Sequence, residues 1–151
     1  MTTIQQAFTA DHRACDESLA ALEKRLLAKA GVECDKQFAR FRLRLEGHFD
    51  AEEQTLFPAI EAVFPGGSGP VSVMRSEHSQ VRELCNEVQE LIGRGEFARA
   101  AETVDLLFSM LQSHNIKEEQ ILYPMCDRLV QSHGEEIARA LAQLVPPSGT
   151  A

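Results

Sequence analysis

The sequence HFDAEEQTLFP at residues 48–58 returns as HNIKEEQILYP at residues 114–124, an offset of 66 positions (114 − 48). Each copy opens with a histidine that a glutamate follows four residues later. These pairs are His48 with Glu52 and His114 with Glu118. The chain therefore contains an internal repeat, and its motif puts an imidazole and a carboxylate on one face of a helix, one turn apart.

The repeat also includes two histidines outside these stretches. With the same offset, Asp11 and His12 fall on Glu77 and His78, so four of the five histidines in the chain are in register. Chance does not easily produce such a coincidence.

Apolar residues recur at intervals of three and four along four segments, as in amphipathic helices. One of the four histidines interrupts each apolar stripe. The stripes are Phe8, His12, Cys15, Leu19, Leu22 and Leu26; Phe38, Phe41, Leu45, His48, Glu52, Leu56, Ala59 and Val63; Met74, His78, Val81, Cys85, Val88 and Ile92; and Val104, Leu107, Leu111, His114, Glu118, Leu122, Met125 and Leu129. The sequence thus predicts four long helices, each with one buried face.

Helix-breaking residues separate the stripes. The first connection is expected to begin at Ala30, with Asp35 as the N-cap of the next helix. Residues 64–70 form the clearest loop, residues 93–95 end the third helix, and residues 135–145 form a fifth amphipathic segment. Short connections make consecutive helices antiparallel neighbours, which predicts an all-α, up-down-up-down four-helix bundle with a short C-terminal helix.

We expect the bundle to span residues 1–131, followed by a C-terminal amphipathic helix and tail at residues 132–151. Pro58 and Pro124 are expected to kink their helices just past the repeated motif. His133 is expected at a helix end and is not predicted to be a metal ligand.

The turns align the four histidines. Midpoints between consecutive histidines of the set fall at residues 30, 63 and 96, beside the three expected turns. In antiparallel helices this brings all four imidazoles to one level of the bundle, on core-facing stripes. Burying them with two carboxylates costs several kcal/mol per unpaired ion, and a bound cation removes that cost. The predicted metal ligands are His12, His48, Glu52, His78, His114 and Glu118.

Imidazole and carboxylate donors together suit iron or manganese, and the absence of paired cysteines makes a structural zinc site less favoured. Two carboxylates can bridge two metal ions and leave each with two histidines. An oxo or hydroxo bridge would add one more donor and still leave at least one open position per metal. We therefore predict a redox or gas-binding role, with a small diatomic molecule or peroxide as the ligand.

The pattern of His12, His48-x3-Glu52, His78 and His114-x3-Glu118 resembles the hemerythrin-like, or HHE cation-binding, family. The resemblance covers about residues 8–130. It implies a four-helix bundle with a non-haem di-iron centre bridged by two carboxylates. Members of the family carry or sense oxygen, sense iron or redox state, or handle nitric oxide and repair damaged iron centres.

Two features differ from the oxygen-carrying hemerythrins. Those proteins have a fifth histidine in an HxxxH motif on the third helix, whereas the residues four positions from His78 here are Met74 and Arg82. The second carboxylate is Glu118 in place of an aspartate. The chain is thus more similar to a four-His, two-Glu branch that includes iron-centre repair proteins and an iron-sensing ubiquitin-ligase domain.

Two classes of function stay open on this basis. One is a di-iron protein that binds, senses or reacts with oxygen, nitric oxide or peroxide, with or without catalysis, or that repairs iron centres. The other is a metal-responsive interaction module read by a protein partner, which the C-terminal helix favours. A ferritin-like oxidase is disfavoured because no histidine has a glutamate three residues before it.

The composition predicts a soluble, cytoplasmic protein, either a monomer or a homodimer. The chain has 151 residues, of which 44% are hydrophobic and 25% charged, as expected of one globular domain. The net charge of −8 argues against nucleic acid and anionic membranes as partners. No apolar stretch reaches the length of a membrane span, and the N-terminus does not read as a signal peptide.

Several residues near the motif have more than one interpretation. Glu53 and Glu119 are expected to face solvent or a neighbouring helix, with a hydrogen bond to an imidazole N–H as the alternative. Tyr123, the only tyrosine, is expected on the bundle surface, with orienting a bound ligand or quenching an oxidant as the alternative. The four widely spaced cysteines are interpreted as buried packing residues in a reducing compartment, although Cys15 and Cys85 share the ligand stripes.

Overall fold

The computed structural model describes residues 2–63, 68–128 and 130–144, and every regular element among them is helical. Two short segments, η1 and η2, are π-helical and continue the α-helices that precede them. The elements are α1 (Ile4–Leu27), α2 (Gly31–Ala51), η1 (Glu52–Leu56), α3 (Phe57–Val63), α4 (Ser68–Gly93), α5 (Phe97–Lys117), η2 (Glu118–Leu122), α6 (Tyr123–Arg128) and α7 (Val130–Gln143).

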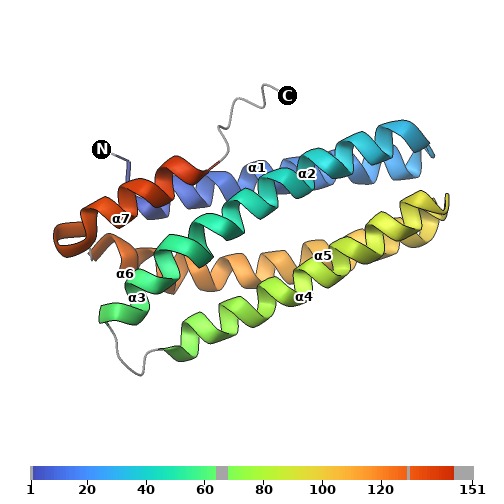
Figure 1. Cartoon of the computed structure of the whole chain (residues 1–151). Coiled ribbons are helices and arrows are strands. Elements are labelled where there is room, and N and C mark those ends of the chain that lie inside the picture. The colour runs from blue at the N-terminus through green and yellow to red at the C-terminus, as the bar shows by residue number, and fades with distance from the viewer. Residues whose placement is uncertain (1, 64–67, 129, 145–151) are drawn as a thin grey trace.

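The long helices form an up-down-up-down four-helix bundle (Figure 1). Helix α1 packs against α2 and α5, and α4 packs against the same two helices from the other side. Helix α7 lies across one end of the bundle and contacts α1, α2 and η1. The predicted all-α bundle with a short C-terminal helix is confirmed, while the division at residue 131 stays a prediction. None of the helices that the structure describes is long and apolar enough to cross a membrane.

The predicted stripes are the buried faces of the helices. Their residues are buried, except Val63 and Met125, which are half-buried, and Leu129, which lies outside the described residues. The apolar side chains form two clusters. One contains Leu19, Phe41 and Leu107, and the other contains Phe8 and Phe57. The four histidines and two glutamates of the stripes form a buried polar layer between these clusters.

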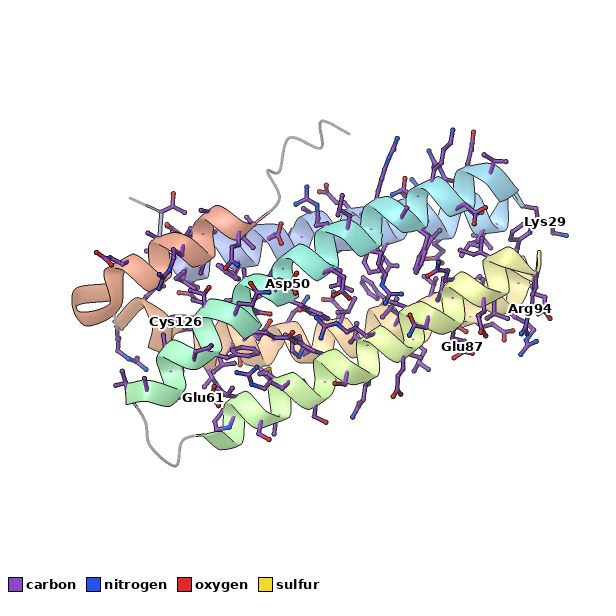
Figure 2. The ribbon with its side chains drawn as sticks, viewed as in Figure 1. Lys29, Asp50, Glu61, Glu87, Arg94 and Cys126 are labelled. Atoms are coloured by element: carbon purple, nitrogen blue, oxygen red, sulfur yellow. The ribbon has the colours of Figure 1, made fainter. Side chains whose placement is uncertain are left out.

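The turns differ from the prediction in detail. Helix α2 begins at Gly31, so Asp35 lies inside the helix and is not its N-cap. The preceding turn is closed by Lys29, whose φ of 53° is in the left-handed region. Residues 93–95 do end the third helix, and Gly95 takes a φ of 72° that a glycine adopts without steric cost. The turns that contain Lys29 and Gly95 lie at the same end of the bundle, as the labels of Lys29 and Arg94 indicate (Figure 2).

Two more expectations need correction. Helix α4 begins at Ser68, so residues 68–70 of the predicted loop are helical, and residues 64–67 lie outside the described residues. Residues 133 and 134 lie within α7 and not at a helix end. A histidine–glycine pair is compatible with a helix interior when tertiary packing supports it, because helix propensity is a weak prior.

The two predicted kinks take the form of π-helical turns. The backbone N–H of Phe57 donates to the carbonyl of Glu52, and that of Tyr123 donates to the carbonyl of Glu118, both five residues back. Each wide turn comes immediately before a proline, which lacks the N–H of a regular turn. The helices therefore continue past Pro58 and Pro124, and each π-helical turn starts at a glutamate of the polar layer, as is common at functional sites.

An adjacent pair of leucines tests the assignment of the core. Leu107 is 0% exposed and Leu106 is 58% exposed. We expect Leu107→Ala to lower the free energy of unfolding by about 2–5 kcal/mol, because it leaves a cavity between the helices. Leu106→Ala should change it by less than about 0.5 kcal/mol. Urea unfolding of the metal-free variants measures both values, and equal effects would contradict this helix orientation.

Candidate metal centre

All six predicted ligand residues meet in the polar layer at the middle of the bundle. None of them is more than 4% exposed. They come from the four long helical segments of the bundle. His12 comes from α1, His48 and Glu52 from α2 and η1, His78 from α4, and His114 and Glu118 from α5 and η2.

The histidines form two pairs, which we call the His12–His48 half and the His78–His114 half. The ring centroids of His12 and His48 are 4.6 Å apart, and those of His78 and His114 are 4.9 Å apart. Each half combines one histidine that precedes a glutamate in the repeated motif with one that does not. Each copy of the internal repeat therefore supplies one pair, made of one histidine of each kind. The two copies are thus related by a twofold arrangement in space.

Each glutamate reaches both halves. Glu52 Oε1 lies 3.5 Å from His48 Nε2 and 3.3 Å from His78 Nε2. Glu118 Oε1 lies 3.3 Å from His114 Nε2 and 3.1 Å from His12 Nε2. A carboxylate that touches one imidazole in each half is in position to bridge two cations.

A separate carboxylate binds the outer nitrogen, Nδ1, of each histidine. These hydrogen bonds are His48 to Asp11 at 2.9 Å, His12 to Glu119 at 2.7 Å, His78 to Glu53 at 2.7 Å and His114 to Glu77 at 2.9 Å. Each one joins two different helices. Because each Nδ1–H donates to a carboxylate, the Nε2 lone pair of a neutral imidazole points to the centre of the site, as metal binding requires.

Glu53 and Glu119 accept a hydrogen bond from an imidazole N–H, which was the alternative to their facing solvent. The sequence did not predict this role for Asp11 and Glu77. A signal for the second pair was present in the sequence, since an acidic residue precedes each lone histidine at the repeat offset of 66. This pattern does not reveal which residues are in contact, because Asp11 binds His48 and not its neighbour His12.

Basic side chains hold three of the acceptors. Arg44 donates to Asp11 at 2.7 Å, Arg82 to Glu53 at 2.9 Å and Lys117 to Glu77 at 2.5 Å. Burial raises the pKa of Glu53, but its hydrogen bonds to His78 and Arg82 outweigh this and lower the pKa to about 2. Glu53 is thus ionised and fixed in place.

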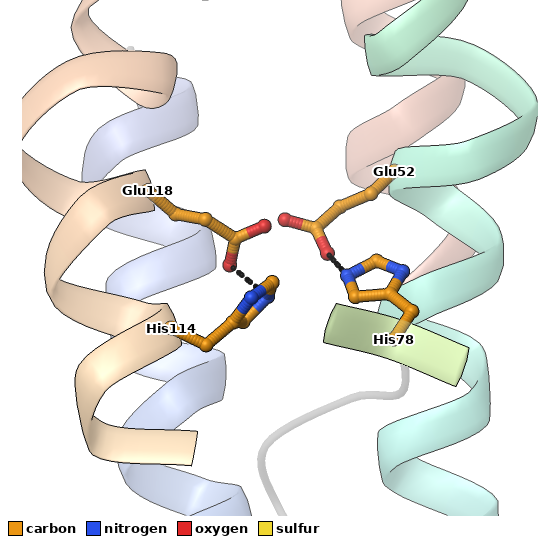
Figure 3. A group of neighbouring side chains, drawn as sticks. All are labelled: Glu52, His78, His114 and Glu118. Carbon is orange, nitrogen blue, oxygen red and sulfur yellow. Dashed lines mark ion pairs between the residues drawn. The ribbon is translucent and has the colours of Figure 1, made fainter. Parts of the chain in front are cut away.

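The inner atoms of the His78–His114 half have no such partners. Glu52 Oε1, His78 Nε2, His114 Nε2 and Glu118 Oε2 are buried without a hydrogen bond. Figure 3 shows these four side chains pointing toward one another, and each offers a donor atom within 4.8 Å of the others. Each unsatisfied buried group costs about 1–3 kcal/mol. The donor set fits a divalent cation, which would satisfy all four atoms together.

Tyr123 is part of the site, contrary to the expectation that it lies on the surface. It is 1% exposed, and its hydroxyl lies among the donor atoms of the His12–His48 half. Its contacts are Glu52 Oε2 at 2.8 Å, Glu118 Oε1 at 2.9 Å, His12 Nε2 at 2.9 Å and His48 Nε2 at 3.1 Å. The sequence signal was its place one residue before Pro124 in the repeat, where the first copy has Phe57.

All four cysteines are free and buried, as interpreted from the sequence. Burial raises the pKa of the Cys85 and Cys126 thiols to about 12 in both cases. Thiols in this state are packing groups, not nucleophiles.

A family model of the hemerythrin HHE cation-binding domain matches residues 3–126, which include the whole polar layer. The chain belongs to this family. Comparisons with curated proteins and with solved structures found no match. Together with the His and Glu cluster, membership of the hemerythrin HHE family indicates a metal centre within the bundle.

In the metal-free protein, the buried imidazoles bind protons, whose positive charge takes the place of the cation. Burial lowers the pKa of His114, but Glu118 outweighs this effect, and the pKa rises to about 9. The pKa values of His48 and His78 are raised in the same way, His48 mainly through Glu52 and His78 through the nearby carboxylates of Glu52 and Glu53. A proton on these imidazoles is thus bound more tightly in the folded than in the unfolded chain.

This linkage predicts how the stability of the metal-free protein depends on pH. A pKa raised above its ordinary value of 6.5 gives stability that is complete below pH 6.5 and is lost as the pH rises toward about 9. We expect the urea midpoint of the metal-stripped protein to fall steadily between pH 6 and pH 8. Glu118→Gln should flatten this fall. A midpoint that is constant or rises over this range would contradict the assignment.

Proposed function

We propose that this hemerythrin-family protein holds two iron ions and binds, senses or reacts with oxygen, nitric oxide or peroxide. One ion would be held by His12 and His48, the other by His78 and His114. Glu52 and Glu118 would bridge the two. The observation that carries the proposal is the reach of each glutamate into both halves, together with four buried inner atoms that have no hydrogen bond.

Iron is favoured by the donor set. Four imidazoles and two carboxylates, with no thiolate among them, suit iron or manganese better than a structural zinc site. When bound, iron with a free coordination position supplies the electrons for chemistry with diatomic molecules and peroxide. Asp11, Glu53, Glu77 and Glu119 would keep the histidines oriented and make their Nε2 atoms stronger donors.

The surroundings of the site support a small ligand. The two apolar clusters on either side of the polar layer exclude bulk water and large substrates. An apolar pocket of about 140 Å³ lies between α4 and α5 with η2, lined in part by Met74 and Leu122. Met74 is one helical turn before His78, and Leu122 is four residues after Glu118. A diatomic gas or peroxide fits a pocket of this size, which opens to the surface beside the exposed side chains of Val73 and Ile121.

Cytoplasmic location and a monomeric or homodimeric state belong to the same proposal. The four buried free thiols agree with a reducing compartment. A purely regulatory, metal-responsive module is the alternative, in which the bound metal would be inert to these ligands.

Metal loading and ligand reaction test the proposal together. Anaerobic loading with iron(II), followed by metal analysis, should give two ions per chain. Exposure to oxygen, nitric oxide or peroxide should then change the visible absorption spectrum within the time of mixing. Two bound ions with an unchanged spectrum would favour the regulatory alternative, and failure to bind iron, manganese or zinc would refute the metal centre.

The bridging glutamates provide a matched pair of variants. Glu118→Gln should lose more than half of the bound iron, because one side chain serves both ions. Glu90→Gln makes the same chemical change at a side chain that is 70% exposed, and it should bind iron like the parent protein. Equal metal content in the two variants would contradict the bridging role.

The outer carboxylates should tune affinity without being ligands. We expect Glu53→Gln to weaken metal binding about 10- to 100-fold, the usual effect of removing a carboxylate behind a metal-binding histidine. Competition with a chelator measures the change. Glu46→Gln removes the other carboxylate bound to Arg82, but does not touch His78, and should leave the affinity within about threefold of the parent.

A further inference from the structure

The two halves of the site differ at one position related by the internal repeat. Phe57 and Tyr123 are equivalent under the offset of 66 (123 − 57). The ring of Phe57 is 5.5 Å from that of His78, and the ring of Tyr123 is 5.5 Å from that of His12. The two rings thus occupy matching places, but only the His12–His48 half receives a hydroxyl.

That hydroxyl has four polar neighbours within hydrogen-bonding distance, two carboxylate oxygens and two imidazole nitrogens. A phenol has one proton to donate and can accept at its oxygen. The four atoms lie 2.8–3.1 Å from the Tyr123 oxygen. Because His12 and His48 donate from Nδ1 to Glu119 and Asp11, their Nε2 atoms face the phenol oxygen as acceptors when neutral. In that state of the imidazoles, the one phenol proton can be donated to only one of the four atoms at a time.

The distances match those between neighbouring ligands of one metal ion. With metal–ligand bonds of about 2.1 Å, adjacent corners of an octahedron are about 3.0 Å apart. An oxygen located 2.8–3.1 Å from four other donor atoms therefore has the position of one ligand beside four others.

We propose that Tyr123 is a seventh metal ligand, bound through its phenolate oxygen to the ion between His12 and His48. This inference rests on the two-metal function proposed above. Binding replaces the phenol O–H bond by an oxygen–metal bond and releases one proton to solvent. The ion between His78 and His114 has Phe57 at the matching place and no such ligand.

The two metal positions are therefore chemically different, and the exogenous ligand binds at the His78–His114 ion. The apolar surroundings of this half agree with that assignment. The ring of Phe49 stacks on His78 with centroids 3.7 Å apart, and Met74, one helical turn before His78, lines the apolar pocket. Its four inner atoms are those without hydrogen bonds.

The position of Tyr123 is fixed by its surroundings. Phe8 packs against its ring at 5.3 Å. Four residues further on, Asp127 accepts hydrogen bonds from the backbone N–H groups of Ile4 and Gln5 at the start of α1. This contact ties α6, which carries Tyr123, to α1, which carries His12.

The test uses the fact that the chain has a single tyrosine. The full-length protein, loaded with iron and oxidised to iron(III), should show a visible phenolate-to-iron charge-transfer band with resonance Raman modes of a bound phenolate. These modes should shift when the protein is made with ring-deuterated tyrosine, a control that needs no variant. Tyr123→Phe should keep two irons by metal analysis and lose the band.

Exchange of the two rings tests the difference between the halves. Phe57→Tyr combined with Tyr123→Phe should bind two irons and regain a phenolate band, now from the His78–His114 half. The double variant should also react more slowly with the exogenous ligand, because its open position is occupied. Two bound irons without a regained band would overturn the equivalence of the two positions.

The outcomes separate this inference from the function on which it rests. Protein with two irons and no phenolate band, or a band that survives in Tyr123→Phe, overturns the role of Tyr123 and leaves the two-metal proposal intact. Protein that binds no iron overturns the metal proposal itself.

Discussion

The fold depends on one constraint, which is that ionisable groups buried between two apolar clusters must each be compensated. The imidazoles of the polar layer meet this requirement on their outer side, where every Nδ1 binds a carboxylate from another helix. Arg44, Arg82 and Lys117 in turn hold three of those carboxylates. On the inner side of the His78–His114 half, four atoms have no hydrogen bond to any described residue, and they define where a cation is needed. The same contacts that fix the helices relative to one another therefore also shape the centre.

The internal repeat explains why the centre has two halves. Each copy of the repeat supplies one histidine with a following glutamate and one without, and the pairs that meet in space combine the two kinds. A cation in either half would be held by two helices of the bundle and by both bridging glutamates. Metal binding and helix packing are thus coupled, because removing a ligand also removes a contact between helices.

The two copies of the repeat differ at positions next to the four histidines and two glutamates. Where the His78–His114 half has Phe57 near its metal position, the other half has the hydroxyl of Tyr123. Arg82, which supports Glu53, has Asp16 as its counterpart under the repeat offset, and Asp16 binds Gln112 instead. The His78–His114 half thus has a phenyl ring and an Arg82-supported carboxylate where the His12–His48 half has a phenol hydroxyl and a carboxylate without that support. A duplicated sequence can in this way provide one position that retains a metal and another that meets a ligand.

The sequence by itself determined the helices, their buried faces and the six inward donors, because these follow from short-range periodicity and from turns midway between the histidines. It could not determine which outer carboxylate binds which histidine. Asp11 contacts His48 on α2 and Glu119 contacts His12 on α1, and such pairings depend on how the helices rotate against each other. The equivalence of Tyr123 to Phe57 in the repeat was also not enough to place the hydroxyl, since the direction of a residue just before a proline depends on the π-helical turn. Local periodicity thus identified the donors, and helix packing alone decided their neighbours.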